Sequence, residues 1–263
     1  MFQLPPFLTM TDFTLFTLVL GRLAGIFSAL PLFGGERVSM KIKAMTVLAM
    51  TLVCFPVLDL AKTPIPSDFI SLCLLVIAET MIGVTLGIVA KAVFGAVEYC
   101  GQVVGMQMGF AMSSLFDPAM GQVPLLAMFQ SMVAMLLFLA LGAHHIFIRA
   151  MVESYTLIPL GGWHMSGDLI NFLVTTTMGI FVLGIKLAAP VMVALLATTV
   201  VLGVMARSFP QMNIFVVSMP LNIGIGFIAL GLSLLVFMHT LEISFGGMAL
   251  QIKSIFRILS SGH

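Results

Sequence analysis

The stretch LINFLVTTTMGIFVLGIKLAAPVMVALLATTVVLGVMA, residues 169–206, decides the fold class of this chain. It is almost entirely apolar, and its formal charge is a single lysine, Lys186, which lies shortly before Pro190. A membrane-spanning helix needs about 20 apolar residues, so this stretch is long enough for nearly two spans. We predict apolar helices here, interrupted near Lys186 and Pro190.

The composition of the whole chain agrees with this prediction. Of its 263 residues, 60% are hydrophobic and only 8% are charged, and the mean hydropathy is +1.20. An average soluble domain has about 25% charged residues, so the solvent of this chain must be lipid or other apolar protein. The net charge of +1 gives no electrostatic basis for binding nucleic acid. We therefore predict an all-α integral membrane or membrane-associated protein.

Further apolar runs predict the remaining helices. About six spans are expected, with eight as the alternative, from runs at residues 13–33, 44–58, 69–90, 92–116, 124–148, 169–206 and 212–241. Residues 242–258 alternate polar and apolar side chains and are predicted to lie on a surface. The loop 34–43 contains Arg37, Lys41 and Lys43, which favours a cytoplasmic position.

Several charges lie inside the apolar runs, namely Arg22, Glu79, Glu98 and Lys186. A charge in lipid is costly, so each of these side chains should face protein or water. Two alternatives are open: an ion or proton relay, and buried pairing between helices or between subunits. We favour pairing and expect Glu79, Glu98 and Lys186 to make contacts between subunits.

No catalytic motif is present. The chain has no H-E-x-x-H, G-x-S-x-G or G-x-x-x-x-G-K-[ST] pattern. His144 and His145 are adjacent, and neighbouring side chains on a helix point about 100° apart, so they should not bind one metal together. Three cysteines, at positions 54, 73 and 100, lack paired spacing and are expected to be small buried hydrophobes. We expect no enzyme activity, no cofactor and no metal.

Glycines four residues apart predict close helix packing. Gly83 and Gly87 form one such pair, and Gly101, Gly105 and Gly109 form a double one. This spacing places a smooth strip along one helix face and allows another helix to approach closely. The strip predicts packing without indicating a particular function.

Residues 101–121, GQVVGMQMGFAMSSLFDPAMG, are too polar and too interrupted for a lipid-facing helix. Irregular backbone at membrane depth is tolerated only when it is buried in protein or lines a water-filled space. Flexible methionine and bulky phenylalanine side chains could close a passage. A pore loop or plug and an ordinary re-entrant or surface loop are equally compatible with these residues.

Three stretches resemble one known family. They are RLAGIFSALPLFGGERVSMKIK at residues 22–43, GQVVGMQMGFAMSSLFDP at 101–118 and LGVMARSFPQMNIFVVSMPLNIGIG at 202–226. They resemble the FliR family of flagellar export proteins, whose counterpart in virulence secretion is the SctT family. The resemblance covers nearly the whole chain.

The resemblance implies a pore-forming subunit of the flagellar type III protein export gate in the bacterial inner membrane, at the flagellar basal body. FliP-like, FliQ-like and FlhB-like subunits and unfolded export substrates are the implied partners. Residues 1–186 would correspond to a FliP-like half with a plug loop at about 105–121, and residues 187–263 to a FliQ-like helical hairpin and C-terminal segment. The implied plug residues are Met106, Met108, Phe110, Met112, Leu115 and Phe116.

Other residue roles follow from the same resemblance. The helices would pack into a ring through Gly83, Gly87, Gly101 and Gly105. A turn with Arg207, Pro210 and Asn213 would face a cytoplasmic partner. The resemblance also implies that many of the apolar helices are covered by neighbouring subunits and lie raised out of the membrane plane.

The alternative is a secondary transporter of small solutes that uses Glu79, Glu98 or Asp117 for ion coupling. Such carriers often show paired internal repeats and broken helices in both halves. The chain shows no convincing repeat, although Pro190 and Pro220 are expected to break the late helices.

Overall fold

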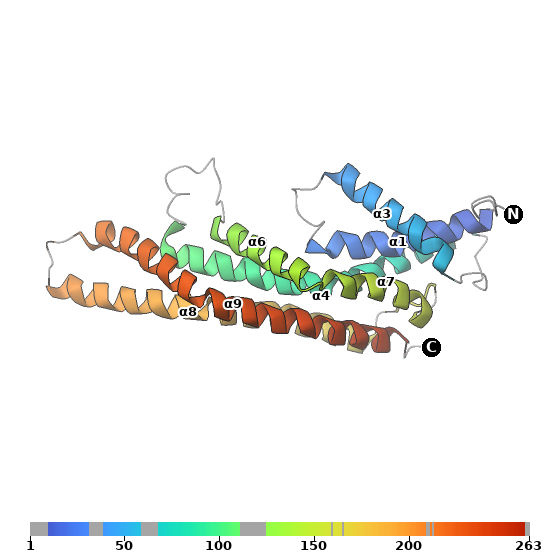
Figure 1. The fold of residues 1–263 in the computed structure, drawn as a ribbon. Coiled ribbons are helices and arrows are strands. Elements are labelled where there is room, and N and C mark those ends of the chain that lie inside the picture. Colours follow the sequence, from blue (N-terminus) through green and yellow to red (C-terminus); the bar gives the residue numbers. More distant parts are fainter. Residues whose placement is uncertain are drawn as a thin grey trace. The chain divides into compact units, whose positions relative to one another are not determined.

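All regular secondary structure in the described part of the computed structural model is helical (Figure 1). The model describes residues 10–31, 39–58, 68–110, 125–158, 160–164, 166–208, 211 and 213–260. Its elements are α1 (Met10–Ala29), α3 (Met40–Cys54), the 3-10 turn η1 (Phe55–Val57), α4 (Phe69–Met108), α6 (Leu125–Ala140), α7 (His144–Leu157), α8 (Gly167–Ser208) and α9 (Ile214–Ser260). The predicted all-α class is confirmed.

Among the described helices, five are long and apolar enough to cross a membrane, and α6 with α7 makes a sixth if this pair is a single span. This count agrees with the six expected. The sequence predicted one span over residues 124–148, and the structure has a bent pair of helices there, because α6 ends at Ala140 and α7 begins at His144. Gly142, between them, has a φ of +65°, a conformation that glycine adopts without strain and that ends a helix.

The three longest helices correct the predicted boundaries. The sequence separated residues 69–90 from 92–116, expected breaks at Lys186, Pro190 and Pro220, and treated 242–258 as a separate segment. The structure has continuous helices of 40 residues for α4, 42 for α8 and 47 for α9. Prolines are tolerated inside apolar helices because neighbouring groups satisfy the freed carbonyls. The predicted division at residues 186 and 187 falls inside α8 and stays a prediction.

Recognisable polar residues mark where two of these helices begin. Asp68 accepts a 3.4 Å hydrogen bond from the main-chain N–H of Ser71 at the start of α4. The Ser166 hydroxyl accepts a 3.2 Å bond from the N–H of Leu169 at the start of α8. Such side chains satisfy N–H groups that have no partner within the helix. Local sequence chemistry therefore sets these boundaries.

The chain forms two compact units. Unit 1 comprises residues 1–91, 142–176 and 247–263. Its core holds fully buried aliphatic side chains from α1 and α4, such as Leu23 and Leu86. Helix α3 packs on α1, where the rings of Phe16 and Phe55 meet edge to face with centroids 5.7 Å apart.

Unit 2 comprises residues 92–141 and 177–246. Its core is aromatic: Phe94, Phe138 and Phe245 contact one another with ring centroids 5.4–5.8 Å apart. These three rings come from α4, α6 and α9, so one cluster joins three helices. Aromatic pairs of this geometry add about 0.5–1.5 kcal/mol each beyond the area they bury.

Candidate functional site

A buried guanidinium lies at the centre of unit 1. Arg22 of α1 has no exposed surface, and its Nε donates a 2.5 Å hydrogen bond to Oε2 of Glu79 on α4. Its terminal nitrogens donate to the main-chain oxygens of Ser154 and Ile158 at 2.9–3.3 Å. The ring of Tyr155 lies against the guanidinium, with 4.2 Å between the ring centroid and Cζ, which is a cation–π arrangement.

The other carboxylate oxygen of Glu79 is engaged as well. Oε1 accepts a 2.8 Å bond from the main-chain N–H of Gly161, in the turn that follows α7. The carbonyls that Arg22 satisfies lie at the C-terminal end of α7, where carbonyls lack helical partners and positive charge is favoured. We call Arg22, Glu79 and their partners at residues 154–161 the Arg22 cluster. It ties α1, α4, α7 and the following turn together with its charges compensated.

The sequence left a relay and buried pairing as alternatives for the charges in the apolar runs. For Arg22 and Glu79, the structure shows pairing between helices of one chain. Glu98 and Lys186 are exposed, and Glu98 accepts a 3.5 Å hydrogen bond from Gln102. Contacts of Glu79, Glu98 and Lys186 with other subunits stay a prediction.

Glycines form the crossing of α1 and α4. An added Cβ at Gly83 would lie 2.9 Å from the main-chain N of Ile26, and one at Gly25 would lie 2.9 Å from the N of Val84. Both distances are shorter than van der Waals contact, so this approach of two backbones needs glycine on both helices. Gly83 is among the glycines predicted to pack helices and Gly25 is not, although Gly21 and Gly25 show the same four-residue spacing.

The other glycines predicted to pack helices have unequal surroundings. A Cβ at Gly87 would lie 2.5 Å from the Cβ of Ala29, and one at Gly101 would lie 2.7 Å from the main-chain N of Ala127. At Gly105 the nearest atom would be 3.8 Å away, which is an ordinary contact. Of these three glycines, Gly87 and Gly101 allow a close approach of helices within the chain, and Gly105 is not needed for one. A packing role of Gly105 in an assembly stays a prediction.

The predicted plug loop is described only at its beginning. Met106 is 55% exposed, whereas Met108 has no exposed surface and lies against Gly226 of α9. Phe110 meets Phe227 edge to face, with ring centroids 6.2 Å apart. The other predicted plug residues lie outside the described residues: Met112, Leu115 and Phe116. The plug role of all six stays a prediction.

The predicted partner-facing turn joins α8 to α9. Arg207, in the last turn of α8, and Asn213, just before α9, are both exposed. Pro210 lies outside the described residues. The exposure of the two flanking residues is compatible with a contact surface, and the predicted contact itself is untested.

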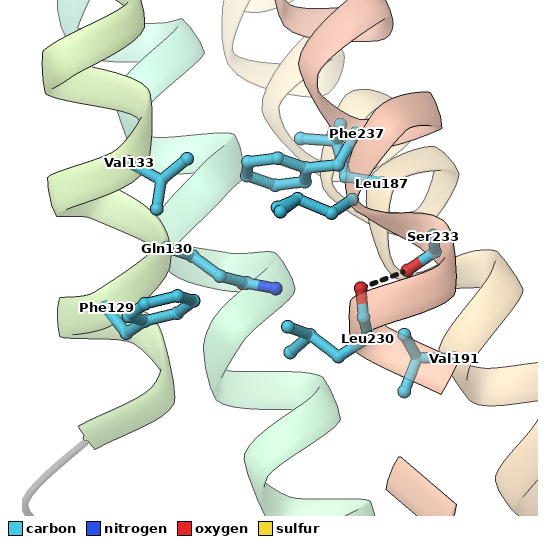
Figure 2. Close-up of a pocket in the computed structure, with 9 residues that line it drawn as sticks. Phe129, Gln130, Val133, Leu187, Val191, Leu230, Ser233 and Phe237 are labelled. Carbon is cyan, nitrogen blue, oxygen red and sulfur yellow. Dashed lines mark hydrogen bonds between the residues drawn. The ribbon is translucent and has the colours of Figure 1, made fainter. Parts of the chain in front are cut away.

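Figure 2 shows a small pocket in unit 2, lined by side chains of α6, α8 and α9. Gln130 points into it and is 6% exposed, and its Oε1 has no hydrogen-bond partner among the described residues. The Ser233 hydroxyl donates to the main-chain oxygen of Leu230 at 3.1 Å. The pocket has room for about one water molecule. The pocket is therefore too small for a solute.

The two adjacent histidines differ from expectation. Their ring centroids lie 4.1 Å apart, because the ring of His145 turns back so that Nδ1 is 3.1 Å from the oxygen of Gly142. The predicted divergence of the His144 and His145 side chains is thus wrong. Within the described ranges, no three His, Cys, Asp or Glu side chains gather closely enough to bind a metal ion.

Helices of this length and apolarity, joined by a buried ion pair and by glycine contacts, define a multi-pass helical membrane protein. Residues 13–248 match the family described as "Bacterial export proteins, family 1". This match covers most of the chain.

Named relatives agree with the family match. The flagellar biosynthetic protein FliR of Bacillus subtilis (strain 168) is 31% identical over 222 residues, which are 83% of this chain and 85% of that protein. FliR of Pectobacterium carotovorum is 32% identical over 214 residues, 81% of each chain. FliR of Escherichia coli (strain K12) is 31% identical over 208 residues, 78% of each chain. The chain belongs to the FliR family of bacterial export proteins.

Proposed function

We propose that this chain is a pore-forming subunit of the flagellar type III protein export gate and passes unfolded flagellar proteins across the bacterial inner membrane. FliP-like, FliQ-like and FlhB-like proteins are its proposed partners in the basal body. The proposal rests on the family, on the name that the relatives carry, and on one physical observation about the longest helices.

That observation is the length over which apolar side chains are exposed along α8 and α9. Large exposed apolar side chains run along α8 from Ile170 to Met205 and along α9 from Val216 to Leu250. At a rise of about 1.5 Å per residue, each row is about 50 Å long. The hydrocarbon core of a bilayer is only about 30 Å thick. Lipid alone leaves part of each row uncovered.

Tilting the helices does not bring the full length of the rows within the hydrocarbon core. Membrane helices tilt by up to about 40°, which leaves a 50 Å row with a height of about 38 Å, still more than the hydrocarbon core. The remaining apolar side chains need protein neighbours, because water would leave them unfavourably exposed. A chain of this kind is suited to an assembly of many apolar helices and is incomplete by itself.

The surroundings of Glu79 argue against the use of this residue for ion coupling in the transporter alternative. A coupling carboxylate has to be reached by the ion from both sides in turn. Glu79 is fully buried, and both of its oxygens are engaged in the Arg22 cluster. Glu98 is exposed, and Asp117 lies outside the described residues. We assign Glu79 a structural role.

The mass and composition of the native complex test the proposal. The complex should be extracted gently from cells that express all flagellar genes, with an affinity tag on this chain. We expect a large, discrete assembly that contains FliP-like and FliQ-like chains. A stable monomer or homodimer without such partners would overturn the proposal. Purified alone in vesicles, the chain should move no small solute.

A further inference from the structure

Helix α3 and the turn η1 that continues it match the thickness of a bilayer. They run from Met40 to Val57, a stretch of 18 residues. The 15 residues of α3 and the three of η1 give a length of about 28 Å, and the hydrocarbon core is about 30 Å thick. The exposed rows on α8 and α9, at about 50 Å, are too long for lipid alone. The α3–η1 stretch therefore differs from them in length.

One narrow side of this stretch packs on its own chain. Only three of its 18 residues are buried, and they lie four positions apart: Val47, Thr51 and Phe55. This spacing places them along one stripe of the helix. The ring of Phe55 contacts Phe16 of α1, and α3 lies beside α1 (Figure 1). In the apolar span of α1, by contrast, 56% of the residues are buried.

Large apolar side chains cover the other side of α3 and η1. They spread over about half of the helix circumference, since successive residues are about 100° apart. Six of them are 44–71% exposed: Ile42, Met45, Leu48, Leu52, Val53 and Val57. No acidic residue occurs between positions 39 and 58. An apolar surface of this breadth is unfavourable in water, so something apolar has to cover it.

The polar groups of this stretch suit lipid as that cover. The hydroxyls of Thr46 and Thr51 donate to carbonyl oxygens four residues earlier in the helix, at 2.9 and 2.8 Å. A lipid-exposed span has to satisfy its polar groups internally in this way. The charges lie at one end, where Lys41 is exposed and Lys43 is half-buried. Lysines at the end of a span extend their ammonium groups to the headgroups.

We propose that α3 and η1 form the span through which this chain contacts phospholipid in the assembled gate, with Lys41 and Lys43 at the phosphates of an anionic leaflet. The loop 34–43 is predicted to be cytoplasmic, and the cytoplasmic leaflet carries anionic lipid that attracts basic side chains. A protein neighbour would not explain why the apolar stretch is as long as the hydrocarbon core is thick. The inference rests on the proposed function for the assembly, in which α8 and α9 have protein neighbours.

Photocrosslinking tests the lipid contact. The photoreactive residue benzoyl-phenylalanine replaces Met45 or Val53 in cells that make the whole gate, and mass spectrometry identifies the adducts after irradiation. Both positions are exposed, so the replacement should not prevent folding. We expect phospholipid adducts at both positions and no link to another protein. A link to another protein at either position would overturn the proposal.

The two ends of the row on α8 provide the comparison. Ile170 and Val204 are exposed and lie about 51 Å apart along the helix, so they cannot both lie in the hydrocarbon core. A protein link at one or both, with lipid adducts on α3, supports both proposals. Protein links on α3 as well remove its lipid contact and leave the proposed function standing. Lipid adducts at all four positions, from a chain that purifies without partners, remove the proposed function and leave the lipid contact of α3.

Lys41→Gln combined with Lys43→Gln tests the headgroup contact. The photoreactive residue stays at Met45, and the ratio of anionic to zwitterionic phospholipid among its adducts is measured. A lysine near an anionic leaflet shifts an equilibrium by about fivefold, so the ratio should fall by about that factor. The matched control is Lys253→Gln with Arg257→Gln, an exposed basic pair on α9, which should leave the ratio unchanged. An equal ratio in the two double variants would overturn the role of Lys41 and Lys43.

Discussion

Different kinds of contact stabilise the core of each compact unit. Unit 1 contains the Arg22 cluster, in which a buried guanidinium and a buried carboxylate meet main-chain groups at the end of α7 and in the turn that follows it. Unit 2 is joined by the rings of Phe94, Phe138 and Phe245 and by the contact of Met108 with Gly226. A buried polar network is geometrically demanding, and a partly satisfied one is costly. Apolar contacts repack more easily.

The two cores should therefore respond differently to substitution. The aromatic contacts of unit 2 can re-form with other partners after a substitution. Unit 1, fixed by charge pairing, would provide the part that keeps its shape. Four substitutions break or sharpen this contrast.

The largest effect is expected for Arg22→Leu. The change leaves Glu79 charged and buried without its partner, which costs about 3–5 kcal/mol of the free energy of unfolding. Denaturation of the detergent-purified chain measures it. The double variant Arg22→Leu with Glu79→Leu should recover much of the loss, because no isolated charge remains. If the single and double variants were equally destabilised, the ion pair would not be what holds unit 1.

Arg22→Lys sharpens the same test. A lysine provides one compact ammonium group, whereas the guanidinium of Arg22 donates to Glu79 and to two main-chain oxygens at once. The two cations are not interchangeable at such sites. We expect Arg22→Lys to restore only part of the stability that Arg22→Leu loses. Full recovery would show that charge alone matters.

An intermediate effect is expected for Gly83→Ala. The methyl group would collide with the backbone of α1 around Ile26, and backbone cannot move aside as a side chain does. Overpacking of this kind costs about 1–3 kcal/mol. Gly179→Ala on α8 is the matched control, since nothing lies within 4 Å of its added Cβ. That control should be neutral or gain up to about 1 kcal/mol in helix propensity. Equal thermal unfolding midpoints for Gly83→Ala and Gly179→Ala would contradict the close crossing of α1 and α4.

The smallest effect is expected for Gln130→Leu in unit 2. It replaces a buried amide whose Oε1 has no partner among the described residues with an apolar side chain of similar size. Such replacements are nearly neutral or stabilising, so the free energy of unfolding should change by less than about 1 kcal/mol. Gln130→Ala, which enlarges the pocket, should destabilise by more. A large loss for leucine would mean that the amide has a partner in the assembled protein.

Much of the fold could be predicted from the sequence. The apolar runs predicted helices and about six spans, because hydropathy is a local property. The sequence predicts a boundary between residues 69–90 and 92–116 and a break at Pro190, because polar and helix-breaking residues usually end helices. Lys186 and Glu98 are instead accommodated on exposed faces of continuous helices.

The candidate sites were less predictable. Arg22 and Glu79 lie 57 positions apart in the sequence, and one sequence carries no signal that pairs them. Gly25 was within reach, because it repeats the spacing used to select Gly83. The contact of Met108 with Gly226 could not be predicted from the sequence, since it depends on how α4 and α9 pack. A glycine in an apolar helix does not say which side chain occupies its space.

The apolar rows on α8 and α9 also affect how much of this protein a cell can accumulate. A copy made in excess of its neighbours would present to water the apolar side chains that extend beyond the bilayer. Exposed apolar surface of this kind is unfavourable in water, and chaperones and proteases remove chains that present it. The steady-state amount of the chain should therefore follow the supply of its assembly partners, and strong overexpression alone should yield rapid turnover.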